Sequence, residues 1–184
     1  MVEFRKGGFS FLAFGSYTSS IEDNQNTNFI AAYTYKNVTF KLCDYFSPND
    51  SLNSVHNYFN YSNNNTKHLI DAQFIIKGGK QLPISLLLST FVYGNDKKKY
   101  STSNNYSSYI ELSYDVSKGD IDYSAFAGVT LWDGFYGSRF GLANLGLSAA
   151  KKIKISENIQ IPVKVNLSTN PIKNNIYFVG IITI

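Results

Sequence analysis

Period-two alternation of apolar and polar residues is the feature that most constrains the fold of this chain. In the segment YSSYIELSYDVS (106–117), the apolar residues Ile110, Leu112 and Tyr114 are separated by single polar residues. Similar runs recur from one end of the chain to the other, and no segment repeats with the 3.6-residue period of a helix. Alternation places successive side chains on opposite faces of a β-strand. The sequence therefore predicts an all-β protein.

The connections between the alternating runs are long and short in turn. We predict about ten strands, at residues 8–19, 28–35, 38–46, 67–77, 83–93, 106–117, 121–132, 142–155, 159–168 and 175–184. Long loops follow the odd-numbered runs and tight turns follow the even-numbered ones. In an up-and-down antiparallel order, this pattern places the long loops on one rim and the short turns on the other, as in bacterial outer-membrane barrels. We therefore expect one β-barrel domain over residues 1–184.

Composition supports β structure and excludes several functional classes. Tyr and Phe contribute 14 residues each, and charged residues make up 16% of the chain, against roughly 25% in an average globular protein. Aromatic residues favour strands. The net charge of +4 comes from lysines in predicted turns and strand ends, which argues against a nucleic-acid partner. Cys43 stands alone, so the chain has no intrachain disulfide and no cysteine metal cluster.

Alternation does not by itself say which face meets water. A soluble barrel turns its apolar face inward, whereas a membrane barrel turns it outward to lipid. Small residues on the apolar faces and aromatic residues at the strand ends favour the membrane arrangement. Most predicted strands are also close to the roughly 9–11 residues that a tilted strand needs to cross the hydrocarbon layer. A soluble sandwich or lipocalin-like ligand-binding barrel is the alternative, because the segment ISLLLSTFV (84–92) is apolar on both faces.

Several segments resemble the outer-membrane barrels known as TorF-like porins, or exported proteins of that kind. The residues that carry the likeness are NVTFKLCDYFSP, YFNY, LPISLLLSTFVYGND, SSYIELSYDV, GVTLWDGFYG and NIQIPVKVNLSTNP. The resemblance implies an outer-membrane location in a Gram-negative bacterium and contact with outer-membrane lipid. Such proteins begin with a cleaved export signal and one further hairpin. We therefore expect this chain, which has no apolar signal segment at its start, to be truncated, and a full-length relative to have twelve strands.

No arrangement of residues predicts catalysis, a metal or a cofactor. His56 lies in a polar loop and His68 begins a strand, with no Asp or Ser spacing that suggests a triad. Some membrane barrels are lipid hydrolases with a rim Ser and His, so His68 is the residue to follow, although we expect it to be a solvated strand-end histidine. We predict a protein that is not an enzyme.

The candidate functional surface is the polar face of the strands. We predict that it lines the lumen of a narrow pore for small solutes, through Lys41, Asp71, Gln73, Glu111, Ser113, Asp115, Asp122, Lys164 and Asn166. A barrel of about eight strands is filled by its own side chains, and one of about sixteen is an open channel, so ten or twelve strands imply a narrow passage. The alternative for a membrane barrel is a closed one that uses its long loops, at 47–66 and 95–105, for adhesion or surface interaction.

Overall fold

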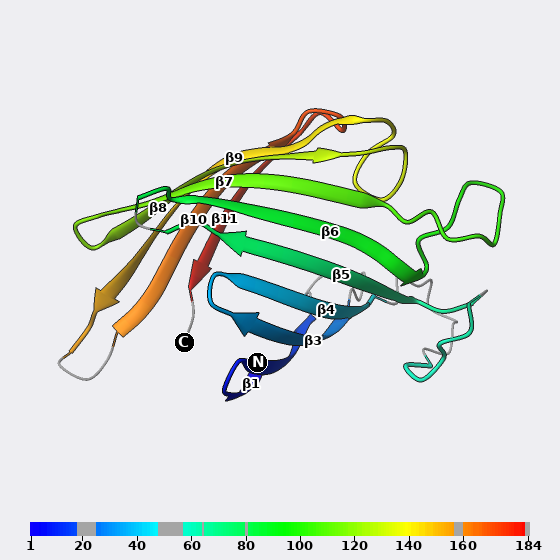
Figure 1. The fold of residues 1–184 in the computed structure, drawn as a ribbon, viewed down its shortest axis with the longest axis horizontal. Helices are drawn as coiled ribbons and strands as arrows, with labels where there is room; N and C mark the ends of the chain where they lie inside the picture. The colour runs from blue at the N-terminus through cyan, green and yellow to red at the C-terminus, as the bar shows by residue number, and fades with distance from the viewer. Residues whose placement is uncertain (18–24, 48–56, 64, 80, 157–159, 183–184) are drawn as a thin grey trace. The chain divides into compact units, whose positions relative to one another are not determined.

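The computed structural model describes residues 1–17, 25–47, 57–63, 65–79, 81–156 and 160–182. In these residues the fold is all-β, and eleven antiparallel strands follow one another in a single sheet in the order in which they occur in the chain. The strands are β1 (Val2–Lys6), β2 (Phe9–Tyr17), β3 (Gln25–Tyr35), β4 (Val38–Phe46), β5 (His68–Lys77), β6 (Ile84–Gly94), β7 (Ser108–Lys118), β8 (Ile121–Thr130), β9 (Gly141–Lys154), β10 (Gln160–Asn170) and β11 (Asn175–Ile182) (Figure 1). None of the described segments forms a helix long and apolar enough to span a membrane.

The predicted up-and-down antiparallel order is confirmed, and the described residues form eleven strands where about ten were predicted. The additional strand is β1, which pairs with β2 through a register that sets Phe4 opposite Phe11. Gly7, with a φ of 59°, makes the tight turn between these strands. No strand was predicted from the sequence for residues 1–7. The alternation of Val2 and Phe4 with charged residues is the period of a short edge strand.

The described chain divides into two compact units. The first unit contains residues 1–75 and 88–108, which include β1 to β4 and most of β5. The second contains residues 76–87 and 109–184, which include almost all of β7 and the whole of β8 to β11. In the second unit these five strands lie side by side in chain order (Figure 1).

In the first unit, one face of the sheet presents large apolar side chains to the surroundings. The register of β2, β3 and β4 aligns Phe11, Ala31 and Leu42 in one row across the three strands. The neighbouring row contains Tyr33 and Phe40, which are 44% and 49% exposed. Exposed aromatic and aliphatic residues therefore form a continuous patch rather than single scattered positions, which is unusual on a surface that faces only water.

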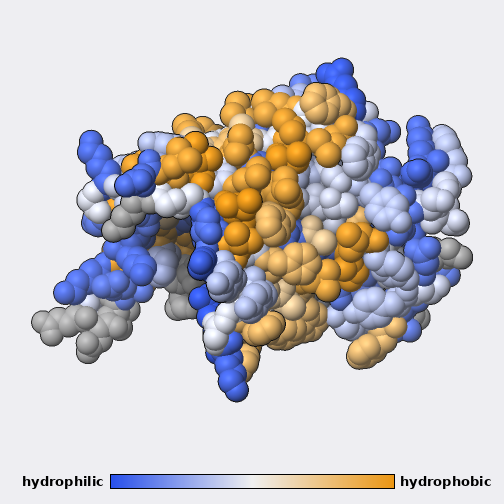
Figure 2. Space-filling model, viewed as in Figure 1, coloured by the Kyte–Doolittle hydropathy of each residue, from blue (hydrophilic) through white to orange (hydrophobic). Residues whose placement is uncertain are grey.

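The second unit has a matching apolar face. Leu112, Ala127 and Leu145 align across β7, β8 and β9, and Leu147 faces Leu167 between β9 and β10. These leucines are 45% to 62% exposed. Figure 2 shows hydrophobic residues gathered over the middle of the strands and hydrophilic residues toward the strand ends. The predicted alternation is confirmed in strands such as β7 and β10, which separate an exposed apolar face from a polar one, whereas β6 and β11 carry apolar side chains on both faces.

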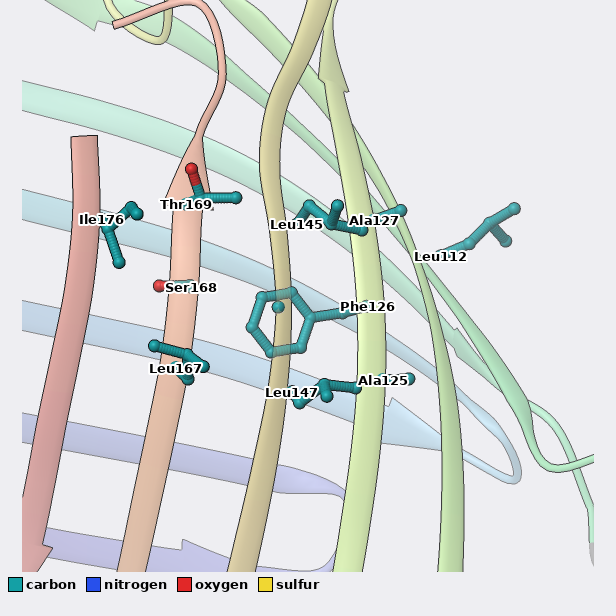
Figure 3. Close-up of a pocket in the computed structure, with 11 residues that line it drawn as sticks. Leu112, Ala125, Phe126, Ala127, Leu145, Leu147, Leu167, Ser168, Thr169 and Ile176 are labelled. Atoms are coloured by element: carbon teal, nitrogen blue, oxygen red, sulfur yellow. The ribbon is translucent and has the colours of Figure 1, made fainter. Parts of the chain in front are cut away.

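Glycines in the second unit make room for aromatic rings on neighbouring strands. Phe126 of β8 lies across β9 at Gly146, directly opposite it in the register (Figure 3). A Cβ at position 146 would overlap this ring and would also lie 2.7 Å from the carbonyl oxygen of Leu167. Tyr109 likewise lies over Gly128. Each glycine thus leaves the space that one aromatic side chain occupies, and we call this space a glycine seat.

An apolar groove runs beside Phe126 over β7 to β11. It has a volume of about 690 Å³ and is lined mainly by leucine and alanine side chains (Figure 3). The groove arises because Ala125 and Ala127 are short beside the leucines of β9 and β10. Most of its lining belongs to the same exposed apolar face, whereas Phe126, Gly146 and Ser168 share a row of the opposite parity.

An exposed ion pair links the short turn between β7 and β8 to β9. Lys151 Nζ lies 2.7 Å from Asp120 Oδ2. The hydrogen bond and charge of Lys151 lower the pKa of Asp120 below its ordinary value of 3.8. Because the folded-state pKa is the lower one, the contribution to stability is present above pH 3.8 and is lost as the pH falls through the folded-state value.

We expect Asp120→Asn to lower the unfolding midpoint slightly at pH 7 and to have no effect at pH 2. The ion pair is exposed, so 1 M salt should abolish the difference at pH 7. Denaturant titrations followed by circular dichroism at the two pH values test this expectation. A difference of the same size at pH 2 would show that the carboxylate charge is not its source.

Candidate polar face and rim cluster

The predicted lumen-lining residues of the second unit lie on one face of its sheet. The register aligns Asp115, Ser124, Ser148 and Asn166 in one row across β7 to β10. The next row toward the short turns contains Ser117, Asp122, Ala150 and Lys164, in the same strand order. Glu111 and Ser113 precede Asp115 at alternate positions of β7. The structure therefore brings Glu111, Ser113, Asp115, Asp122, Lys164 and Asn166 to one surface, opposite the exposed leucines.

Glu111 takes part in a small hydrogen-bond network on this face. Its carboxylate accepts hydrogen bonds from the hydroxyl of Tyr109 and from Asn144 Nδ2, the latter at 3.0 Å. Asn144 also donates to the Tyr109 oxygen at 3.1 Å. The Glu111 side chain is thus held in place by β7 and β9 at the end of β7 near the long loops. Sequence reasoning found Glu111 but not its partners, because Asn144 comes from a strand two positions away in the sheet.

Serine hydroxyls hold the two aspartates nearer the short turns. Asp115 Oδ2 accepts hydrogen bonds from Ser85 at 3.1 Å and from Ser113 at 3.2 Å, and Asp122 Oδ1 accepts one from Ser117 at 2.6 Å. Asp115, Asp122 and Lys164 all line a polar recess of about 270 Å³.

The first unit positions the other three predicted residues around Cys43. Asp71 is 1% exposed and accepts hydrogen bonds from Ser89 Oγ at 2.8 Å and from Gln73 Nε2 at 2.7 Å. Asp71 and Lys41 both lie near enough to act electrostatically on the Cys43 thiol, which is 1% exposed. A buried carboxylate with several donors is a paired, structural arrangement on the polar face of β4, β5 and β6.

His68 forms a buried cluster that the sequence did not predict. Its side chain is 0% exposed, which makes the expectation of a solvated strand-end histidine wrong. The ring Nδ1 lies 2.7 Å from Asp44 Oδ1, and Nε2 lies 2.6 Å from the backbone carbonyl oxygen of Tyr58. Tyr61 stacks on the imidazole with the ring centroids 3.9 Å apart, and Phe46 packs against it at 4.7 Å. We name Asp44, Phe46, Tyr58, Tyr61 and His68 the rim cluster.

Both ring nitrogens of His68 have hydrogen-bond partners. The Tyr58 carbonyl only accepts, so Nε2 donates to it. Nδ1 lies within hydrogen-bond distance of Asp44 Oδ1. His68 therefore has no free nitrogen with which to act as a general base.

The rim cluster fastens part of a long loop to the ends of the strands. The Tyr61 hydroxyl donates to Asp44 Oδ2 at 2.7 Å, and its burial and this carboxylate raise the pKa of Tyr61. Tyr93, near the end of β6, donates to the Tyr61 carbonyl oxygen at 2.5 Å. Lys97 Nζ lies 2.6 Å from Asn63 Oδ1. These contacts join residues 57–63 to β4, β5 and the segment after β6.

The surroundings of His68 bear on the rim Ser–His arrangement considered in the sequence analysis. The hydrogen-bond partners of the His68 ring are a carboxylate and a carbonyl, and no serine is among them. No group of three His, Cys, Asp or Glu side chains in the described segments is placed to hold a metal ion. His56 lies outside the described residues.

Comparison with family models, with curated proteins and with solved structures finds no match to this chain.

Proposed function

We propose that this chain is a membrane-spanning β-barrel of the bacterial outer membrane, and that its polar face lines a narrow passage for small solutes. The observation that carries the proposal is the inverted polarity of the sheet. Leu147 and Phe178, on the apolar face of the second unit, are 62% and 75% exposed, whereas Asp71, on the polar face of the first unit, is 1% exposed. A lipid environment removes the cost of the exposed apolar face.

Closure of the sheet is part of this proposal. In lipid, an unpaired strand edge leaves backbone N–H and C=O groups without hydrogen-bond partners. Each such group costs on the order of several kcal/mol of free energy. The edges of β1 and β11 therefore need partners in a membrane. The alternation of long loops and short turns fits a barrel whose turns lie on one rim.

The first test measures folding with and without detergent micelles. We expect cooperative β-sheet circular dichroism when the denatured chain is diluted into micelles, and none when it is diluted into buffer alone. Folding in plain buffer to a monomer would contradict the membrane proposal and support a soluble ligand-binding barrel. A matched soluble β-sandwich, diluted in parallel, controls for micelle-induced changes in the signal.

Charge reversal tests the passage itself. We expect Glu111→Lys combined with Asp115→Lys to shift the ion selectivity of single channels in planar bilayers toward anions, because both carboxylates lie on the polar face. Lys173→Glu in the loop before β11 is the control, since Lys173 Nζ contacts the Phe135 carbonyl away from that face. Unchanged selectivity in the double variant would exclude these carboxylates from a conduction path.

A closed barrel that presents its loops is the second candidate, and the rim cluster favours it. Residues 57–63 are held by Asp44, Tyr93 and Lys97 rather than left unsupported. A loop fixed in one conformation is suited to recognition, because less conformational entropy is lost on binding. A barrel that folds in micelles but shows no conductance would support this function over the pore.

A further inference from the structure

We propose that the polar recess in the second unit binds small zwitterions that carry an ammonium group and a carboxylate a few carbons apart. This inference rests on the proposed passage, because it names the class of solute that the polar face selects. The recess has a volume of about 270 Å³ and is lined by Asp115, Asp122 and Lys164 together with Val116, Ser117, Tyr123, Ser124, Ser148 and Ala150. That volume suits a ligand smaller than the drug-sized molecules that fill pockets of roughly 300–1,000 Å³.

The recess exists because small residues separate its charged walls. Asp122 and Lys164 occupy the same row of the register with Ala150 between them, and Ser148 occupies the neighbouring row. Strands lie about 4.8 Å apart, so the backbones that carry Asp122 and Lys164 are separated by roughly 10 Å. Alanine and serine fill little of this distance, which leaves a hollow between opposite charges.

The opposite charges do not neutralise one another across the hollow. In the described residues, no ion pair joins Lys164 to Asp115 or Asp122. Each aspartate has serine hydroxyls on one carboxylate oxygen, namely Oδ2 of Asp115 and Oδ1 of Asp122. The second oxygen of each carboxylate is thus left for another donor. Lys164, itself exposed, provides the complementary cation.

A zwitterion satisfies both walls at once. Its ammonium group donates to Asp115 or Asp122, and its carboxylate accepts from Lys164, with both contacts assisted by charge. Near the recess, Asn166 Oδ1 is buried and has no hydrogen-bond partner in the described structure, so it is a further acceptor that suits an ammonium group. Asn166 is the register partner of Ser148, which lines the recess. A molecule with a single charge satisfies only one of the two walls.

Calorimetric titration of the full chain tests this inference in whichever medium it folds. The probe is 4-aminobutanoate, and butylamine and butanoate are the single-charge controls. We expect the zwitterion to bind about tenfold more tightly than either control, since each lacks one charge-assisted contact. Equal affinities for the three compounds, or no binding of the zwitterion, would overturn the inference. Conductance measured on the same preparation tests separately whether the chain forms the proposed passage.

Variants separate the two walls of the recess. We expect Asp122→Asn to weaken 4-aminobutanoate binding about tenfold while butanoate binding stays unchanged, and Lys164→Gln to weaken it similarly while butylamine binding stays unchanged. Ser148→Val should also weaken binding, because it fills the hollow without altering charge. Lys118→Gln, outside the recess lining, is the matched control. Wild-type affinity in both charge variants would overturn the proposed site.

Discussion

Asp44→Ala is expected to destabilise the folded chain by about 2–4 kcal/mol, because it removes one partner of the buried, hydrogen-bonded His68–Asp44 pair. The imidazole of His68 is 0% exposed, and its Nδ1 loses the carboxylate that lies 2.7 Å away. The same substitution removes the acceptor of the Tyr61 hydroxyl. Breaking such a pair costs more than the pair itself contributes, because an unpaired polar group is left away from water.

Urea titration followed by circular dichroism, in the medium in which the chain folds, measures this loss. Asp120→Ala is the matched control: it also removes a carboxylate from an ion pair, but one that is exposed, and we expect little change. Chymotrypsin provides a second measurement, because Tyr58, Phe59 and Tyr61 should become sites of cleavage when residues 57–63 detach. Equal midpoints for the two variants, with no new cleavage, would show that the rim cluster does not hold the loop.

Gly146→Ala is expected to destabilise the second unit by about 1–3 kcal/mol, the usual cost of overfilling a packed site. The added methyl group would overlap the Phe126 ring and lie 2.7 Å from the Leu167 carbonyl oxygen. The ring can move, but the carbonyl belongs to the backbone of β10 and cannot move without loss of strand pairing. The overlap with the Phe126 ring can therefore be relieved, but the overlap with the Leu167 carbonyl oxygen cannot.

Gly180→Ala is the matched control for this prediction. A Cβ at Gly180 meets nothing within 4 Å. This substitution should therefore be neutral, or stabilise the fold by up to about 1 kcal/mol because alanine lowers the conformational entropy of the unfolded chain. The double variant Gly146→Ala with Phe126→Ala should recover part of the loss caused by Gly146→Ala, relative to Phe126→Ala alone. Comparable midpoints for the two glycine variants would contradict the proposed seat for Phe126.

Local pattern was sufficient to predict most of the sheet. The strand 38–46 was predicted with the bounds that the structure has, because Lys36 and Asn37 mark a tight turn and the alternation after them is regular. Other predicted strands lie within three residues of the observed ones. The first strand was missed because only five residues carry its pattern, and three of them are charged.

The rim cluster could not be predicted from local sequence patterns. His68 meets a carboxylate 24 residues earlier and a carbonyl 10 residues earlier in the chain, and neither contact has a fixed spacing that a sequence reveals. Asp44 lies on the apolar face of β4, at the parity of Phe40 and Leu42. A charge in that position was the available signal, since a carboxylate on an otherwise apolar face needs a partner. By contrast, the residues of the polar face were found because alternation alone selects them.

The glycine seats have a consequence for how this sequence can vary over evolution. The aromatic ring at position 126 occupies the space beside Gly146, and the ring at 109 occupies the space beside Gly128. A descendant that loses either glycine must move or shrink the ring, so we expect the two positions of each pair to change together. Such paired replacements persist after overall similarity has decayed, and they provide a means of recognising distant homologues by this register.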